Sequence, residues 1–212
     1  MLLQDPLPNE PRRKRRQVDG RRLRSERTRH LIIEAYLDLL KLVPGVPTAG
    51  QIAEHAGYSV RSIFERFSDL DALSLAAVDY ALAVGQAEAV ARDVDGDRPT
   101  RIRSHVETRA YACEKWLPLW RILVSTQNRF ADLKSRVALA RQGNLERLRL
   151  MYRPELSTLE APAREQLLVA LVVLSSFEGW DLMRDHFGLS TEDAREVWRS
   201  MIDRMLPPTP QA

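Results

Sequence analysis

The sequence contains a single cysteine, Cys113, so no disulfide can form within the chain. It also lacks any run of about 18 apolar residues, and the longest candidate, Leu167 to Phe177, is too short to cross a bilayer. The basic residues near the N-terminus follow a short apolar patch, which reverses the order found in secretory signals. These absences predict a cytoplasmic protein that does not contact membranes.

Motifs for catalysis and metal binding are also missing from the sequence. The four histidines are scattered, and there is no HExxH pattern, paired cysteine, glycine-rich phosphate loop or nucleophile elbow. Asp181, Asp185 and His186 would fit a metal site on one helix, but an ordinary polar helix face explains them more simply. We therefore predict that the protein is not an enzyme and that it holds no metal or cofactor.

Positive charge is concentrated near the N-terminus. Residues 12–24 contain eight basic residues and one acidic residue, a net charge of +7, whereas the whole chain carries +3. The rest of the chain therefore carries about −4. With three prolines and little apolar periodicity, residues 1–24 are predicted to form a disordered basic arm. Such an arm either contacts nucleic-acid phosphates, through residues that include Arg21, Arg22 and Arg24, or only keeps the protein in solution.

Apolar residues recur at helical spacing over most of the remaining chain, and no stretch shows the alternation typical of strands. The 44% apolar content is sufficient for a hydrophobic core. We therefore predict an all-α protein. After the arm, the expected parts are a helix-turn-helix domain at 25–71, a larger helical domain at 72–206 and a tail at 207–212.

The stretch from Thr48 to Phe67 has the pattern of a helix-turn-helix. Thr48 and Gln51 form a capping box that predicts the start of one helix, and Gly57 suits the positive φ at which that helix would end. Ser59 can cap a second helix. The apolar stripe expected in the second helix consists of Val60, Ile63, Phe64 and Phe67. The opposite face is polar and fits a DNA major groove; its members are Arg61, Ser62, Glu65 and Arg66.

This stretch resembles the DNA-binding domain of the TetR family of transcriptional regulators. Residues 27–43 are similar to the family's first helix, and residues 67–82 are similar to its fourth. The chain departs from the family at two positions, because Phe64 stands where a tyrosine is usual and Leu70 where a lysine is usual. By resemblance, both usual residues contact DNA phosphates. The resemblance also implies a larger domain that binds a small effector, which shifts the spacing of the two DNA-binding heads of a dimer.

The candidate DNA-binding residues of the helix-turn-helix are Thr48, Tyr58, Ser59, Arg61, Ser62 and Arg66. Arg61 lies in the first turn of the second helix, where recognition residues usually reach base edges, and Arg66 is expected mainly to position the head. Thr48 and Ser59 are helix caps first and phosphate ligands second. Tyr58 either packs in the turn or contacts a phosphate.

Further helices are expected after the helix-turn-helix. Ser68 with Asp71 predicts a capping box for a fourth helix that runs toward Ala91. Pro118 is expected to break or kink the helix that follows. A long amphipathic helix is then predicted over 130–152.

The last two helices, at 162–187 and 191–205, are predicted to form a dimer. The first is apolar on nearly every side and the second has one apolar face, so one subunit of this size is not expected to cover both. By resemblance, the corresponding pair forms a four-helix bundle across a twofold axis. The predicted interface residues are Leu171, Leu174, Val197, Trp198, Ile202 and Met205.

Large aromatic residues around Pro118 are candidates for lining an effector cavity. They are Trp116, Trp120, Phe177 and Trp180. The alternative interpretation is that these side chains form plain hydrophobic core.

Together these features predict a transcriptional repressor that binds a palindromic operator on double-stranded DNA as a homodimer. Release from the operator is expected on binding a small, partly apolar molecule. The alternative is a helical interaction module of the same fold without specific operator binding, as the missing tyrosine and lysine would suggest.

Overall fold

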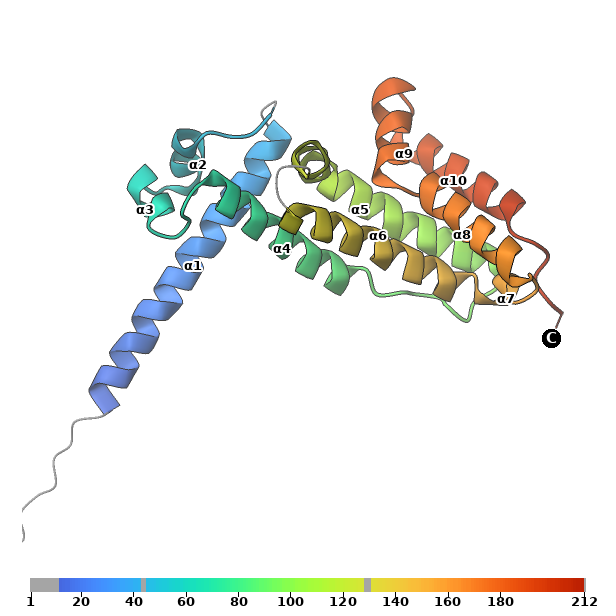
Figure 1. Cartoon of the computed structure of the whole chain (residues 1–212), viewed down its shortest axis with the longest axis horizontal. Coiled ribbons are helices and arrows are strands. Elements are labelled where there is room, and N and C mark those ends of the chain that lie inside the picture. The colour runs from blue at the N-terminus through green and yellow to red at the C-terminus, as the bar shows by residue number, and fades with distance from the viewer. Residues whose placement is uncertain (1–11, 43–44, 128–130, 212) are drawn as a thin grey trace, which may run out of the picture. The chain divides into compact units, whose positions relative to one another are not determined.

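The computed structural model describes residues 12–42, 45–127 and 131–211. Every regular element in these ranges is a helix, which confirms the all-α prediction. The chain divides into two compact units, the first ending at Ala77 and the second beginning at Val78 (Figure 1). One helix, α4 (Leu70–Glu88), contributes residues to both units.

The first unit is built on the C-terminal part of α1 (Arg12–Leu42), against which α2 (Ala49–Ala56) packs. The short helix α3 (Val60–Phe64) packs on α2 in turn. Apolar residues at helical spacing face inward from these helices and from the start of α4, and their burial stabilises the unit. The fully buried members include Ile32, Tyr36, Ile52, Ile63 and Leu73.

The first helix begins at Arg12, so the prediction that residues 12–24 are disordered and that the helix starts at Ser25 is wrong. Residues 1–11 of the predicted arm lie outside the described residues. Arginine and lysine are good helix formers, and no proline occurs between Arg12 and Leu42. Because α1 is already held by packing from Thr28 onward, extending it toward the N-terminus avoids the cost of a new helix nucleus.

The fourth helix is capped one residue later than predicted. Asp69, and not Ser68, caps it, because the Asp69 Oδ1 atom accepts a hydrogen bond from the Ala72 N–H at 2.7 Å. The Ser68 hydroxyl donates to the Asp69 carboxylate at 3.1 Å and so holds the cap in place. The helix ends at Glu88 and does not reach Ala91.

The second unit is a bundle in which α5 contacts α6, α9 and α10, and α8 contacts α6 and α10 (Figure 1). Its core includes the fully buried pair Trp180 and Trp198, whose ring centroids lie 4.6 Å apart. Besides the end of α4, the elements of this unit are α5 (Arg98–Thr126), α6 (Ala131–Met151), α7 (Arg153–Leu156), α8 (Ala161–Leu174), α9 (Phe177–Asp181), the π-helical turn η1 (Leu182–His186) and α10 (Thr191–Met205).

Pro118 does not end a helix, because α5 continues from Arg98 through it to Thr126. A proline removes one backbone donor, but packing of α5 on its neighbours keeps the helix continuous here. The helix predicted over 130–152 corresponds to α6, which begins at Ala131, and Phe130 lies outside the described residues.

The helix predicted over 162–187 is interrupted at two consecutive serines. The Ser175 hydroxyl donates to the Leu171 carbonyl at 2.7 Å, and the Ser176 hydroxyl caps α9 by accepting from the Gly179 N–H at 2.9 Å. Serine side chains that bond to nearby backbone compete with helical hydrogen bonds, which explains the break. The final helix begins as predicted, because Ser190 accepts from the Asp193 N–H at 3.1 Å.

No single helix of the described ranges is long and apolar enough to cross a membrane. Taken together, α8 and the segment Phe177–His186 are long and apolar enough by length and composition alone, but the pair is bent by 43° at the break between them.

Candidate functional site

The helix-turn-helix is formed by local hydrogen bonds at both of its predicted caps. The Thr48 hydroxyl accepts from the Gln51 N–H at 3.3 Å, and the Gln51 side chain accepts from the Thr48 N–H at 2.9 Å. This is the predicted capping box, and it fixes the first residues of α2. Thr48 remains exposed, so its hydroxyl and the start of α2 face solvent.

The turn between α2 and α3 is made by Gly57 and Tyr58. Gly57 has φ of +70°, a conformation that costs residues with a side chain more than it costs glycine. The Tyr58 N–H closes the helix by donating to the Ala53 carbonyl at 2.9 Å. The Tyr58 hydroxyl lies 3.4 Å from the Thr28 hydroxyl on α1, so Tyr58 packs in the turn and ties it to α1.

The start of α3 is capped by Ser59, whose hydroxyl accepts from the Ser62 N–H at 3.2 Å. The Ser59 and Ser62 hydroxyl oxygens also lie 3.1 Å apart. Both serines are therefore occupied in shaping the start of α3, and each hydroxyl keeps further hydrogen-bonding capacity toward a ligand.

The two arginines of the predicted contact face differ in how freely they can move. The Arg61 side chain is 88% exposed, and its one ion pair among the described residues is with Glu65, at 3.1 Å. The Arg66 guanidinium donates to the Ser62 carbonyl at 2.9 Å and is mostly covered by the unit. Arg61 can therefore extend to a base edge at the cost of an exposed ion pair, whereas Arg66 supports α3.

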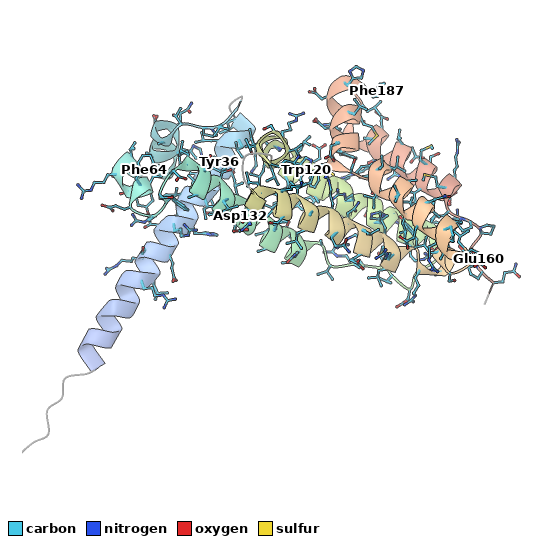
Figure 2. The ribbon with its side chains drawn as sticks, in the orientation of Figure 1. Tyr36, Phe64, Trp120, Asp132, Glu160 and Phe187 are labelled. Carbon is cyan, nitrogen blue, oxygen red and sulfur yellow. The ribbon has the colours of Figure 1, made fainter. Side chains whose placement is uncertain are left out.

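Two apolar residues predicted to face inward instead lie on the outer face of α3. Phe64, labelled in Figure 2, is 48% exposed and Val60 is 41% exposed. Among the apolar side chains of α3, only Ile63 is buried, on the side that packs on α2. Phe64 and Val60 are thus functional candidates that the periodicity assigned to the wrong face, and apolar side chains of this kind suit thymine methyl groups.

The arm residues lie in α1. Arg22 and Arg24 are exposed, and Arg22 pairs with Glu26 at 2.9 Å. The side chain of Arg21 lies outside the described residues. Leu70 is the first residue of α4 and is half-buried. It stands where the family resemblance leads us to expect a lysine.

A cavity of about 270 Å³ lies in the second unit between α4, α5, α6 and the start of α9. Of the four predicted pocket residues, Trp116, Trp120 and Phe177 line it. Trp180 does not, because it packs against Trp198 in the core and its indole N–H donates to Glu114 at 2.8 Å. The sequence could not separate these tryptophans, because all of them lie on apolar helix faces.

Two arginines of this cavity were missed by the sequence analysis. Arg109 and Arg147 both line it, and the described lining residues include no aspartate or glutamate. Arg109 donates to the Ser175 carbonyl at 2.7 Å and stacks 4.5 Å above the Phe177 ring. Only the packing of α5 beside α6 brings these two side chains together, so no local motif could have revealed them.

The predicted dimer residues divide into covered and exposed positions. Leu171, Trp198 and Ile202 are fully buried within one protomer, which contradicts their predicted place on a dimer surface. Leu174 and Met205 are half-buried. The large exposed apolar side chains of α8 and α10 are Val169, Val173, Val197 and Met201.

Two buried groups have pKa values far from the usual range. Burial, with the charges of Arg109 and Arg147, lowers the pKa of His105 to about 3, and its Nδ1 atom lies 2.6 Å from the Tyr152 hydroxyl. Burial raises the pKa of the Cys113 thiol to about 11, so this cysteine is an inert core residue at neutral pH. Among the described residues, no group of three or more histidine, cysteine or acidic side chains could hold a metal.

No protein-family model and no curated protein matches the sequence, but solved structures with a similar fold do, among them two bacterial proteins. A protein from Rhodococcus sp. described as a TetR-family transcriptional regulator superposes with a TM-score of 0.65 at 18% identity, over 85% of this chain and 100% of that one. One from Mesorhizobium loti, described in the same way, gives 0.52 at 16% identity, over 86% and 96%. The chain therefore has the fold of the TetR-family transcriptional regulators.

Proposed function

We propose that the protein is a sequence-specific DNA-binding transcriptional regulator of the repressor type. It binds a palindromic operator as a homodimer, and a small molecule that enters the cavity of the second unit releases it. The observation that carries this proposal is the complete helix-turn-helix, in which both caps and the left-handed Gly57 are in place while Arg61 remains exposed. A short helix presented in this way suits the major groove.

The contact face of α3 combines charge with apolar surface. Arg61 is the candidate for reading a guanine, since arginine can donate two hydrogen bonds to that base. Val60 and Phe64 flank it as exposed apolar side chains that can contact thymine methyls. Thr48 and Ser59 hold the starts of α2 and α3, and backbone N–H groups at such positions bind phosphate.

The rival function is a helical interaction module with the same fold and no operator. It is favoured by Phe64 and Leu70, which provide neither the hydroxyl nor the amine that the resemblance associates with phosphate contacts. Gel-shift assays with fragments of the protein's own upstream region separate the two functions. A regulator retains a retarded band in excess competitor DNA, whereas an interaction module gives no band that survives the competitor.

Within this assay, Arg61→Ala should weaken operator binding by about 1–3 kcal/mol and weaken binding to random DNA much less. The reason is that one bidentate base contact is lost while the phosphate contacts remain. Arg103→Ala removes the same charge from an exposed position in the second unit and should change neither affinity. Equal losses on both DNAs for Arg61→Ala would show that Arg61 contacts phosphate.

We further propose that the basic N-terminal part of α1 supplies phosphate contacts in place of the missing tyrosine and lysine. A protein shortened to begin at Leu23 should bind both operator and random DNA more weakly. Each lost phosphate contact should flatten the plot of log affinity against log salt by about 0.9. The measurement is a salt series by fluorescence anisotropy.

The matched control begins at Arg12 and lacks only residues 1–11, which contain no basic residue. It should keep the affinity and the salt slope of the full chain. If the protein that begins at Leu23 also keeps both, the basic segment serves only to keep the protein in solution.

A further inference from the structure

We infer that the cavity of the second unit binds an organic monoanion with an aromatic or apolar body and one carboxylate, held by Arg147 and Arg109. This inference rests on the proposed function, because it assigns a chemical class to the effector.

The walls of the cavity suit an apolar body. Most lining residues are aliphatic or aromatic, and Trp120 stacks on Phe177 with ring centroids 4.6 Å apart (Trp120 is labelled in Figure 2). Gly85 lies opposite Trp116, where an added Cβ would stop 3.9 Å from the Trp116 Nε1 atom. The volume of about 270 Å³ fits a small molecule and not a peptide.

The charge of the cavity is positive and uncompensated. Arg147 has no hydrogen bond or ion pair within the described parts of the chain, although it is half-buried. Arg109 has a backbone carbonyl and an aromatic ring as partners, and among the described residues it has no carboxylate. A buried or half-buried cation is normally paired, so two such cations in one cavity favour an anionic ligand.

Other arginines of the same unit show that carboxylates are available nearby. Arg141 pairs with Glu178 at 2.8 Å, and Arg136 pairs with Asp79 at 2.7 Å. Both lie on α6, the helix that also carries Arg147. The absence of an acid in the lining is therefore specific to the cavity and does not reflect a general shortage of acidic residues.

The electrostatic environment of the two arginines also favours an anionic ligand. Burial, together with the positive charge of Arg109, lowers the pKa of Arg147. The protein thus bears an unfavourable interaction at this site that a bound carboxylate would offset. Charge-assisted hydrogen bonds between guanidinium and carboxylate are among the stronger polar contacts that proteins make.

Further polar atoms at the cavity remain unpaired. Within the described structure, the buried indole N–H groups of Trp116 and Trp120 have no hydrogen-bond acceptor. The buried Asn144 Oδ1 atom has no hydrogen-bond donor there. The other end of the Asn144 amide donates to the Ser175 hydroxyl at 3.1 Å, which fixes its orientation. The two indole N–H groups can donate to a carboxylate, whereas the Asn144 oxygen can only accept and so calls for a donor elsewhere on the ligand.

The test is isothermal titration calorimetry of the full-length protein with 3-phenylpropionate, 4-phenylbutyrate and octanoate, each compared with its uncharged primary amide. At least one carboxylate should bind, and its amide should bind about tenfold more weakly or worse. Arg147→Met should weaken carboxylate binding by about tenfold or more and leave amide binding unchanged. The methionine keeps the apolar stem, and because no partner of Arg147 is lost, the variant should fold.

Arg149→Met is the matched control. It removes the same charge two residues later on α6, from an exposed arginine that pairs with Glu146 and Glu165, and should leave binding unchanged. Gly85→Leu, which extends a side chain toward Trp116, should weaken binding of both the carboxylate and the amide if they occupy this cavity.

Three results would overturn the inference: no carboxylate binds at millimolar concentration, amides bind as tightly as carboxylates, or Arg147→Met and Arg149→Met behave alike. Gel shifts with the same ligands separate this inference from the proposed function. A carboxylate that binds through Arg147 without affecting the retarded band upholds the ligand class and contradicts effector release.

Discussion

Charging the exposed valines of α8 and α10 should produce a monomer that binds operator DNA about 10²–10⁴-fold more weakly, the range that two linked contacts can add over one. The variant is Val169→Glu with Val197→Glu, at positions that are 63% and 38% exposed in the protomer. Each new carboxylate would lose water at the proposed interface, which is costly for a charge, while the exposed position leaves the protomer fold intact. Light scattering and gel shifts are the measurements.

Val90→Glu with Leu150→Glu places the same charge on exposed apolar residues outside α8 and α10, and this control should remain dimeric. By contrast, Leu171→Glu would charge a fully buried position and unfold the protomer, so it cannot serve as an interface test. A wild-type protein that is monomeric at micromolar concentration would contradict the proposed dimer.

Replacing Glu155 by alanine should lower the free energy of unfolding by about 3–5 kcal/mol, because it leaves the charge of a buried arginine without its carboxylate partner. Arg101 donates to both Glu155 carboxylate oxygens, at 2.6 and 2.8 Å, and the two side chains are almost fully buried. The Thr209 hydroxyl donates to the same carboxylate at 2.5 Å, so the pair also holds the C-terminal segment. Urea unfolding of the variant measures the loss.

The control is Glu165→Ala, which removes an exposed carboxylate 3.4 Å from Arg149 and should cost less than about 1 kcal/mol. A loss of similar size in both variants would show that the buried pair adds no special stability.

The buried pair should also give a defined pH dependence. Burial alone would raise the pKa of Glu155, but hydrogen bonds from Arg101 and Thr209 outweigh it, so the pKa lies below the ordinary value of 4.5. A carboxyl with a lowered pKa stabilises the folded state above its unfolded pKa, and this contribution is lost as the pH falls through the folded value. The stability difference between wild type and Glu155→Ala should therefore be constant at neutral pH and shrink below about pH 4.5.

The sequence alone was sufficient for the helix-turn-helix. Thr48 with Gln51, and Ser59 with Ser62, are pairs three residues apart, and Gly57 needs only its own backbone freedom. Interactions of such short range do not depend on the rest of the chain, so the caps and the turn were predicted correctly. The same local signals supported the resemblance that the fold has now confirmed.

Tertiary structure decided which face of each helix is covered. Phe64 and Ile63 are adjacent apolar residues, and only the packing of α3 on α2 buries one and exposes the other. In α8, which is apolar on nearly every side, the sequence could not distinguish buried Leu171 from exposed Val169. The choice depends on neighbours that are distant in sequence.

The candidate cavity depended on tertiary structure most of all. Arg109 and Arg147 lie on different helices, and their shared lack of a carboxylate becomes visible only when α5 and α6 are packed together. Trp180 is instead placed against Trp198, in the short helix that follows the break at Ser175 and Ser176. Caps and turns depend on residues a few positions apart in the sequence. The burial of a side chain and the charge that lines a cavity depend on packing between distant segments, which hydrophobic periodicity does not reveal.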